Sequence, residues 1–240
     1  MLSLQGQREE AEKQNEEGEK MKARKIFLAV LAAVGLLLAG WVAYVFSTPA
    51  EDVNAKVWLL TDDVQSVDAK RWRGVATEAG MDSCLSFLEG RPQARVWFHI
   101  GTLADEDFDA YVDTLGTRMA RMQADRSQLV MEGTQLDVLN WFNKQHIYTV
   151  YTMDAACPSS LTQTQIDSVV VRMSRVAESG CARAICIPAC WYGIMRGLYR
   201  ESGVEYVVRR PDTSLFWLRM SPRGQRMLRD SRVRIIAVRP

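Results

Sequence analysis

Five side chains suited to acid–base or metal chemistry follow predicted strands in this chain. Each is a carboxylate or an imidazole at the end of a β-forming run; they are Asp62, Asp63, His99, Glu132 and Asp154. Because sites in parallel α/β folds form at the carboxyl ends of the strands, we expect these side chains to meet at one rim. Carboxylates beside an imidazole can transfer protons or bind a divalent metal. All five are therefore candidate catalytic residues, and Asp62, Asp63 and His99 are candidate metal ligands.

The same residue types also have a structural interpretation. An Asp that follows a strand often caps the next helix, and carboxylates are favoured at helix N-termini. His99 could equally be a hydrogen-bonded structural side chain. The prediction therefore concerns the joint arrangement: residues of one site converge, whereas capping residues lie apart.

Several common catalytic and binding motifs are absent from the sequence. It has no G-x-x-x-x-G-K-[ST], G-x-G-x-x-G, G-x-S-x-G or H-E-x-x-H, which disfavours nucleotide-binding enzymes, typical serine hydrolases and zincins. The pair Asp62-Asp63 with the later His99 resembles the metal-holding residues of membrane-attached polysaccharide deacetylases. That resemblance covers these residues alone. The His-x-x-x-His pair of that family is missing, since His99 and His146 are 47 residues apart.

Strand-like and helix-like segments alternate along most of the chain. Strands are predicted over β-forming runs at residues 56–61, 94–100, 128–131, 146–152, 182–187, 204–208, 215–218 and 232–238. Helices are predicted over residues 66–80, 105–125, 134–143 and 191–201, from Thr162 or Thr164 to Gly180, and after Ser221-Pro222. This alternation predicts an α/β fold with a mainly parallel sheet. Periodicity leaves two architectures open, an open doubly wound sheet and a small irregular β/α barrel.

An uncharged run of 21 residues, Ile26 to Phe46, precedes this α/β domain. As a helix it is long enough to cross a bilayer core of roughly 30 Å. Lys22, Arg24 and Lys25 lie before it, so the positive-inside rule keeps the N-terminus in the cytoplasm. We therefore predict a single-pass signal-anchor, a linker over residues 47–54 and an extracytoplasmic domain over residues 55–240.

The same run has a second interpretation, as a cleaved signal peptide. It is longer than a typical apolar region of about 7–15 residues, and no A-x-A site follows it, so we favour the uncleaved anchor. Residues 1–25 are expected to be a disordered cytoplasmic segment, since residues 1–20 are polar with no core-forming pattern. Met21 opens a stretch typical of the start of an exported protein, and we consider it an alternative start.

All five cysteines lie in the predicted outer domain: Cys84, Cys157, Cys181, Cys186 and Cys190. In an oxidising compartment we expect a disulfide among the last four, and the odd count leaves a thiol over. Cys157 and Cys190 both follow predicted strands and could meet at the rim. A nucleophilic thiol there, with His99 as its base, is a further alternative.

Residues 196–240 hold 11 Arg and four acidic residues. This balance predicts contact with an anionic glycan or an anionic lipid surface, whereas an extracytoplasmic location disfavours nucleic acid. A solvated strand face explains the alternation at residues 232–234 without any partner. Two functions follow from the whole sequence: a membrane-anchored hydrolase of envelope or extracellular glycans, and a non-catalytic binding or scaffold module of an envelope assembly.

Overall fold

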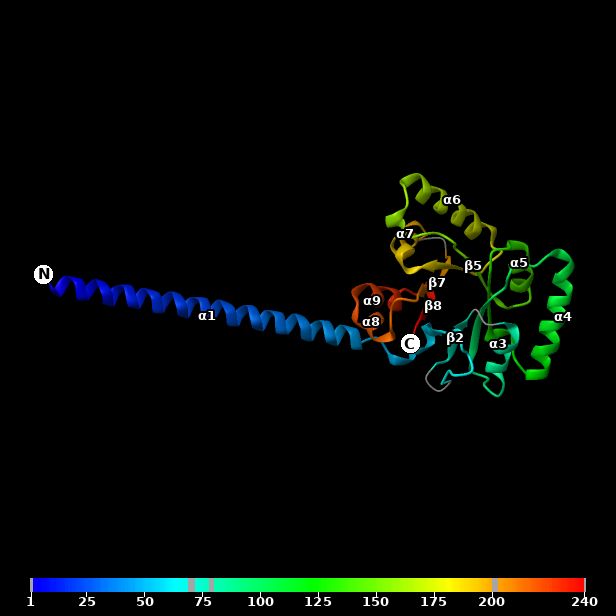
Figure 1. Cartoon of the computed structure of the whole chain (residues 1–240), viewed down its shortest axis with the longest axis horizontal. Coiled ribbons are helices and arrows are strands. Elements are labelled where there is room, and N and C mark those ends of the chain that lie inside the picture. Colours follow the sequence, from blue (N-terminus) through cyan, green and yellow to red (C-terminus); the bar gives the residue numbers. More distant parts are fainter. Residues whose placement is uncertain (1, 69–71, 78–79, 200–202, 240) are drawn as a thin grey trace. The chain divides into compact units, whose positions relative to one another are not determined.

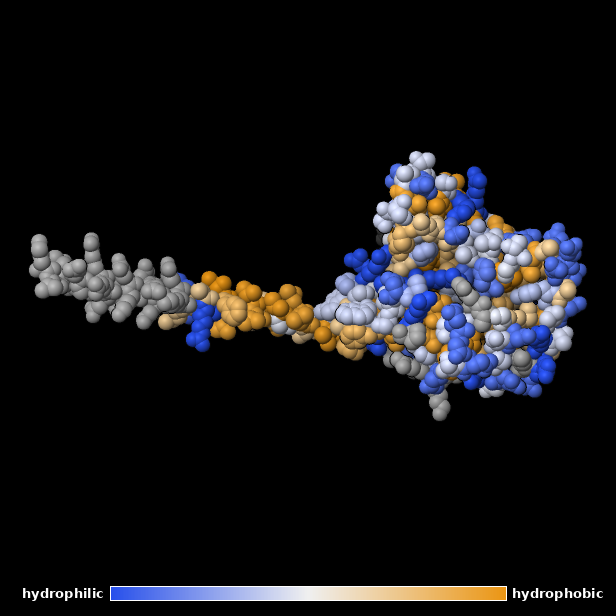
Figure 2. Space-filling model, viewed as in Figure 1, coloured by the Kyte–Doolittle hydropathy of each residue, from blue (hydrophilic) through white to orange (hydrophobic). Residues whose placement is uncertain are grey.

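The computed structural model describes residues 2–68, 72–77, 80–199 and 203–239, and the chain divides into two compact units, Met1–Thr48 and Pro49–Pro240. The first unit is formed by one long helix, α1 (Leu2–Phe46). Within the described residues, its part Met21–Phe46 is the one helix apolar and long enough to cross a membrane. Figure 2 shows this apolar band on the helix. Such a helix near the N-terminus suggests a membrane anchor or a signal sequence.

The N-terminal part of α1 differs from our expectation. Residues 2–25, which we expected to be disordered, continue the same helix in the structure. The physical reason is composition, because Glu, Gln, Lys and Ala all have high intrinsic helix propensity.

In the described part of the second unit, eight parallel strands form a closed barrel in which each strand pairs with the next and β8 returns to β1 (Figure 1). The strands are β1 (Val57–Leu60), β2 (Gly74–Thr77), β3 (Arg95–His99), β4 (Leu129–Gly133), β5 (Tyr148–Thr152), β6 (Ala184–Pro188), β7 (Glu205–Arg210) and β8 (Val233–Val238). Of the two architectures that periodicity left open, the barrel is the one observed.

Helices separate most of the strands and lie around the outside of the barrel (Figure 1). They are α2 (Ala50–Lys56), α3 (Met81–Leu88), α4 (Asp105–Met122), α5 (Leu136–Lys144), α6 (Gln163–Ser179), α7 (Tyr192–Leu198), α8 (Leu215–Met220) and α9 (Pro222–Arg229). The parallel strand order requires these crossover connections, because a tight turn can join only antiparallel strands.

The barrel interior is filled by side chains at alternate strand positions. Its apolar members are Trp58, Ala76, Trp97, Val130, Val150, Ala184, Cys186, Val207, Ile235 and Ala237. Large and small residues face one another: a Cβ on Gly74 would lie 2.1 Å from the ring of Trp58. A second apolar layer packs between strands and helices, so the barrel is a solid core rather than a pore.

Two predicted elements are wrong where the structure describes them. Residues 66–80 were expected to form one helix, but they contain β2; residues 69–71 and 78–79 of that prediction lie outside the described residues. Residues 215–218 were expected to be a strand, but they begin α8. The aromatic pair Phe216-Trp217 suggested β structure. In the structure both side chains are exposed while Leu218 is buried, a pattern that the helix satisfies.

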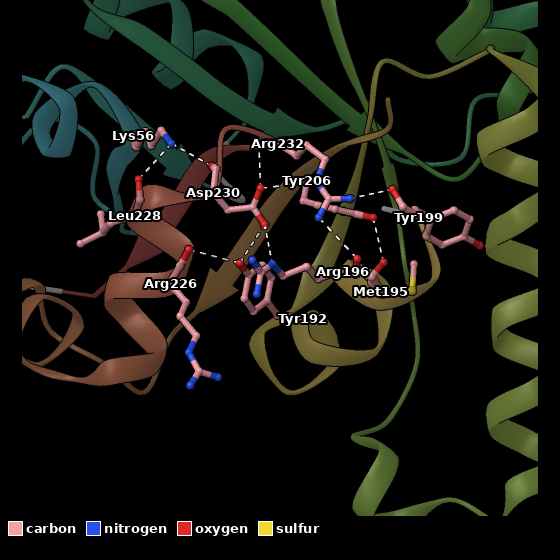
Figure 3. Close-up of polar contacts among 10 residues, drawn as sticks. All are labelled: Lys56, Tyr192, Met195, Arg196, Tyr199, Tyr206, Arg226, Leu228, Asp230 and Arg232. Carbon is pink, nitrogen blue, oxygen red and sulfur yellow. Dashed lines mark hydrogen bonds and ion pairs between the residues drawn. The ribbon is translucent and has the colours of Figure 1, made fainter. Parts of the chain in front are cut away.

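Asp230, just after α9, contacts helices that are far apart in the sequence (Figure 3). Its carboxylate accepts hydrogen bonds from the Tyr192 hydroxyl at 2.9 Å and from the Arg232 backbone N–H at 3.1 Å. Arg196 and Arg232 also form ion pairs with it. Lys56, at the end of α2, donates to two carbonyl oxygens at the end of α9, one of them that of Asp230 itself. This network fixes α2, α7 and α9 against β8.

Replacing Asp230 by Asn is expected to make stability less dependent on pH. Burial alone would raise the pKa of Asp230, but hydrogen bonds from Arg232 and Tyr192 outweigh it and lower that pKa. Asp230 therefore adds stability above its unfolded pKa of about 3.9, and this stability is lost as the pH falls through the folded-state pKa. At pH 7 the variant should be less stable by about 1–2 kcal/mol.

Urea unfolding of the full chain in detergent, followed by tryptophan fluorescence from pH 7 to pH 3, measures this effect. The gap between the natural chain and Asp230→Asn should narrow as the pH falls toward 3. Asp113→Asn, on the exposed part of α4, is the matched control and should track the natural chain throughout. A gap that stays constant with pH would contradict the assignment.

Candidate functional site

A buried carboxylate lies near the carboxyl end of β4. The side chain of Glu132 is fully buried, and its Oε2 accepts a hydrogen bond from Trp97 Nε1 at 2.9 Å. Its Oε1 accepts one from Thr152 Oγ1 at 2.9 Å, and Arg209 forms an ion pair with Oε2. The Arg209 guanidinium also lies 5.1 Å from the centre of the Trp97 ring. These four residues, from β3, β4, β5 and β7, are called the Glu132 cluster below.

The Glu132 cluster places an ion pair in a barrel interior that is otherwise mostly apolar. Burying an ion pair carries a large desolvation penalty, which mutual attraction offsets only when additional hydrogen bonds satisfy the carboxylate. Here Trp97 and Thr152 supply those bonds. The side chain of Arg209 is 31% exposed, whereas that of Glu132 is 0% exposed. Glu132 therefore holds Arg209, and Arg209 is the member of the pair that can meet a ligand at the rim.

Cys186 on β6 belongs to the same part of the barrel interior. Burial raises the pKa of the Cys186 thiol well above its ordinary value, and the charge of Glu132 acts in the same direction. A thiol that stays protonated is a poor nucleophile and a poor metal ligand. Cys186 thus takes part in the packing around the Glu132 cluster as a buried thiol.

The structure brings two of the five candidate catalytic residues together. His99 ends β3 and pairs in register with Glu132 on β4, so the two lie side by side at the carboxyl end of the barrel. His99 is exposed there, whereas Glu132 is buried. Asp62, Asp63 and Asp154 lie on exposed loops that follow β1 and β5 at the same end.

The three aspartates follow two different strands, and the convergence expected for them stays a prediction. Asp63 acts in a turn, where its Oδ1 accepts a hydrogen bond from the Gln65 backbone at 3.2 Å. Asp154 accepts one from Arg172 through its backbone carbonyl at 2.9 Å. Across the described ranges, no three His, Cys, Asp or Glu side chains are grouped so that they could hold a metal. Metal binding by Asp62, Asp63 and His99 therefore stays a prediction.

Sequence reasoning missed Arg209, which we assigned to a general Arg-rich tail. A signal was present: Arg209 directly follows the predicted strand 204–208 and is two residues after Val207, so strand alternation places the two on the same face. A cation at an inward position needs a buried anion, and Glu132 occupies a strand end as well. Trp97 and Thr152 gave no such signal, because their types are ordinary for strands.

A disulfide joins Cys157, after β5, to Cys190, after β6, with their Cα atoms 5.6 Å apart. This confirms the expected disulfide within the last four cysteines and rules out the alternative of a nucleophilic thiol at either residue. Trp191, next to Cys190, is buried and donates a hydrogen bond from Nε1 to the Ala156 carbonyl at 2.8 Å. The bond therefore crosslinks two packed loops at the carboxyl end of the barrel, and it suggests an oxidising compartment.

Two further arginines accompany Arg209 at this end. Arg210 follows it on β7, and its Nε and Nη1 are buried without a hydrogen-bond partner in the described part of the chain. Arg223 donates to the carbonyl oxygen of Ala189, just after β6. Burial lowers the pKa of Arg210 and the charge of Arg223 lowers it further, with Asp212 opposing both. Arg209, Arg210 and Arg223 are called the rim arginines below.

Comparison with known proteins gives a fold likeness and no family. No protein-family model matches the chain, and no curated protein sequence matches it. Among solved structures it is similar to the dihydropteroate synthase of Yersinia pestis, with a TM-score of 0.43 and 14% identity over 77% of this chain and 86% of that one. It is also similar to the PaMucR phosphodiesterase in its c-di-GMP complex, with a TM-score of 0.34 and 12% identity over 58% and 65% of the two chains. Likeness this distant assigns no activity, so the function of this β/α barrel must be argued from its own site.

Proposed function

We propose that this protein is a single-pass membrane-anchored hydrolase whose barrel domain acts outside the cytoplasm on an anionic envelope glycan. The location rests on the apolar helix Met21–Phe46, on the cations Lys22, Arg24 and Lys25 at its start, and on the disulfide. Cations on the N-terminal side keep that side cytoplasmic, and structural disulfides persist in oxidising compartments.

The observation that carries the proposal is the Glu132 cluster. A guanidinium that is already paired with a buried carboxylate is pre-organised, so its side chain loses little conformational entropy when it binds an anion. Arginine binds carboxylate and phosphate groups through two parallel hydrogen bonds. The other rim arginines add positive charge at the same end of the barrel. An acidic sugar supplies the anion that this arrangement fits.

Exposed aromatic side chains support a glycan rather than a small anion. Phe216 and Trp217 lie in the first turn of α8, which starts shortly after β7 ends at Arg210. They are 62% and 64% exposed, and their rings pack edge to face with the ring centres 5.3 Å apart. Aromatic rings with one apolar face in water can pack against the apolar faces of sugar rings.

His99 is the proposed proton-transfer residue of the hydrolysis. It is exposed at the rim and pairs in register with Glu132, which holds Arg209. In the proposed site, a substrate bound by Arg209 therefore lies close to His99. In the proposed reaction His99 gives a proton to the leaving oxygen. One of the exposed aspartates, Asp62, Asp63 or Asp154, takes the proton of the attacking water. Glu132 positions Arg209.

Replacing His99 by Asn is expected to lower kcat about 100-fold, because positioned acid–base groups contribute that much or more. The assay uses the full chain, extracted from membranes with detergent, and measures reducing ends released from acidic envelope polysaccharides. The melting temperature should not change, since His99 is exposed. His146→Asn is the matched control, because His146 is exposed at the opposite end of the barrel and should keep full activity.

The same assay tests a second candidate function, a non-catalytic glycan-binding module. The exposed pair Phe216 and Trp217 and the complete burial of Glu132 favour it. A binding module would retain the polysaccharide without releasing reducing ends, and His99→Asn would then leave retention unchanged. Full activity of His99→Asn would contradict the catalytic role of His99. If the natural chain binds the polysaccharide but releases no reducing ends, the result supports the binding module instead.

A further inference from the structure

The N-terminal end of the barrel contains a cavity that the proposed hydrolysis does not use. Its volume is about 500 Å³, and residues at the starts of several strands line it. Its apolar lining includes Trp58, Val130 and Ile235, which belong to the barrel interior. In β/α barrels the catalytic site lies at the other, carboxyl end of the strands, so this cavity is a separate feature.

The cavity is strongly cationic. Of the described residues that line it, four are Lys or Arg and one is acidic; these are Lys56, Arg95, Arg183, Arg234 and Glu205. Concave surfaces lined by one sign of charge concentrate ions of the opposite sign. An anion is therefore the expected ligand, provided that some of these cations are not already engaged.

Two of the four cations are engaged by the protein itself. Arg234 donates from Nε to Glu205 Oε1 at 2.7 Å, and the Tyr148 hydroxyl donates to the other oxygen of Glu205 at 2.6 Å. Lys56 donates to the carbonyl oxygens of Leu228 and Asp230 (Figure 3). The single carboxylate of the cavity is thus satisfied by these internal contacts.

Arg95 and Arg183 are the remaining cations. In the part of the chain that the structure describes, neither forms an ion pair, and both are exposed. The Arg183 guanidinium lies 5.5 Å from the centre of the Tyr148 ring, which supports the guanidinium plane and leaves its N–H edge free to donate. Two guanidinium groups lining one cavity supply the hydrogen-bond donors and the positive charge that a phosphate group binds.

We propose that this cavity binds a phosphate group, carried by a phospholipid headgroup or by a phosphorylated solute. The lipid source is within reach of the chain. Ala55 and Lys56 line the cavity, and Ala55 follows Phe46, the last residue of the apolar helix, by nine residues. Nine residues span at most about 32 Å, which limits the distance between Ala55 and the end of the apolar helix. The lipid source rests on the proposed anchor; phosphate binding does not.

Inorganic phosphate is the first probe. The full chain in dodecyl maltoside micelles, which carry no phosphate, is titrated by calorimetry. Arg95→Gln and Arg183→Gln should each weaken binding about tenfold, the usual loss for one charge-assisted hydrogen bond. Arg175→Gln, an exposed arginine on α6 outside the cavity, is the matched control and should bind like the natural chain. No binding by the natural chain, or equal binding by all three variants, would overturn the proposal.

Nanodiscs then distinguish the two sources of phosphate. If a lipid headgroup is the ligand, phosphatidylcholine discs, whose lipid carries a phosphate group, should lower the heat of phosphate titration relative to phosphate-free dodecyl maltoside micelles. Equal titrations in discs and in micelles would assign the cavity to a soluble phosphorylated ligand. His99 does not line the cavity, so His99→Asn should bind phosphate like the natural chain. Loss of hydrolysis and loss of phosphate binding are therefore measured independently.

Discussion

Replacing Arg209 by Met is expected to lower the free energy of unfolding by about 3–5 kcal/mol, because it leaves a buried charge without its partner. Glu132 is 0% exposed, so water cannot replace the lost guanidinium. The hydrogen bonds from Trp97 and Thr152 would remain, but they do not neutralise the carboxylate. Urea unfolding of the full chain in detergent, followed by tryptophan fluorescence, measures the loss.

The double variant Arg209→Met with Glu132→Gln is the decisive control. Removing both charges should restore stability to within about 1–2 kcal/mol of the natural chain, since well-packed neutral residues often replace buried ion pairs at little cost. Glu132→Gln alone should be milder than Arg209→Met, because the stranded Arg209 is 31% exposed and partly hydrated. If the double variant were as unstable as the sum of the two single variants, the coupling assigned to this pair would be absent.

Replacing both Cys157 and Cys190 by Ala is expected to lower the free energy of unfolding by about 3–4 kcal/mol. The two residues are 33 positions apart, and the bond closes a loop that includes the whole of α6. Without the bond the unfolded chain gains the freedom of that open loop. The melting temperature of the full chain in detergent, with and without reductant, measures the effect.

Cys181→Ala is the matched control for the disulfide. Cys181 is a free, partly exposed thiol in the same half of the domain, and its replacement should change stability by no more than about 0.5 kcal/mol. Reductant should lower the melting temperature of the natural chain and of Cys181→Ala but leave the double variant unchanged. A natural chain that is insensitive to reductant would show that the bond contributes nothing to stability.

The barrel places the two proposed ligand sites at opposite ends of the same strands. The rim arginines and His99 lie at the carboxyl ends, and the cationic cavity lies at the amino ends. Strand β4 contributes to both sites: Val130 lines the cavity, and Glu132 holds Arg209. Variants at one end can therefore be assayed with the other end as an internal control.

The sequence by itself determined the elements whose signals are local. Residues 162–180 carry both ends of α6: Thr162 caps it by accepting a hydrogen bond from the Gln165 backbone, and Gly180 ends it with a φ of 64°. Ser221 and Pro222 likewise begin α9. Such signals lie within a few residues of the hydrogen bonds that they make, so they can be read without knowing the fold.

The tertiary structure alone decided which distant segments pair. β2 has four residues and little sequence signal, and it is a strand because β1 and β3 supply hydrogen-bond partners on both sides. Closure of the barrel depends on β8 meeting β1, which local periodicity does not encode.

The same limit applied to the candidate site. The strand-end positions of His99 and Glu132 could be read from β-forming runs, and their adjacency follows from parallel pairing. The partnership of Glu132 with Arg209, 77 residues later, could not, because it depends on the number and order of strands between them. Asp62, Asp63 and Asp154 lie on exposed loops after β1 and β5, and their convergence with His99 and Glu132 stays a prediction. Residue types and spacing thus determined which groups reach the rim, whereas barrel closure decided which of them meet, because contacts across a barrel are set by the global register and not by neighbours in the chain.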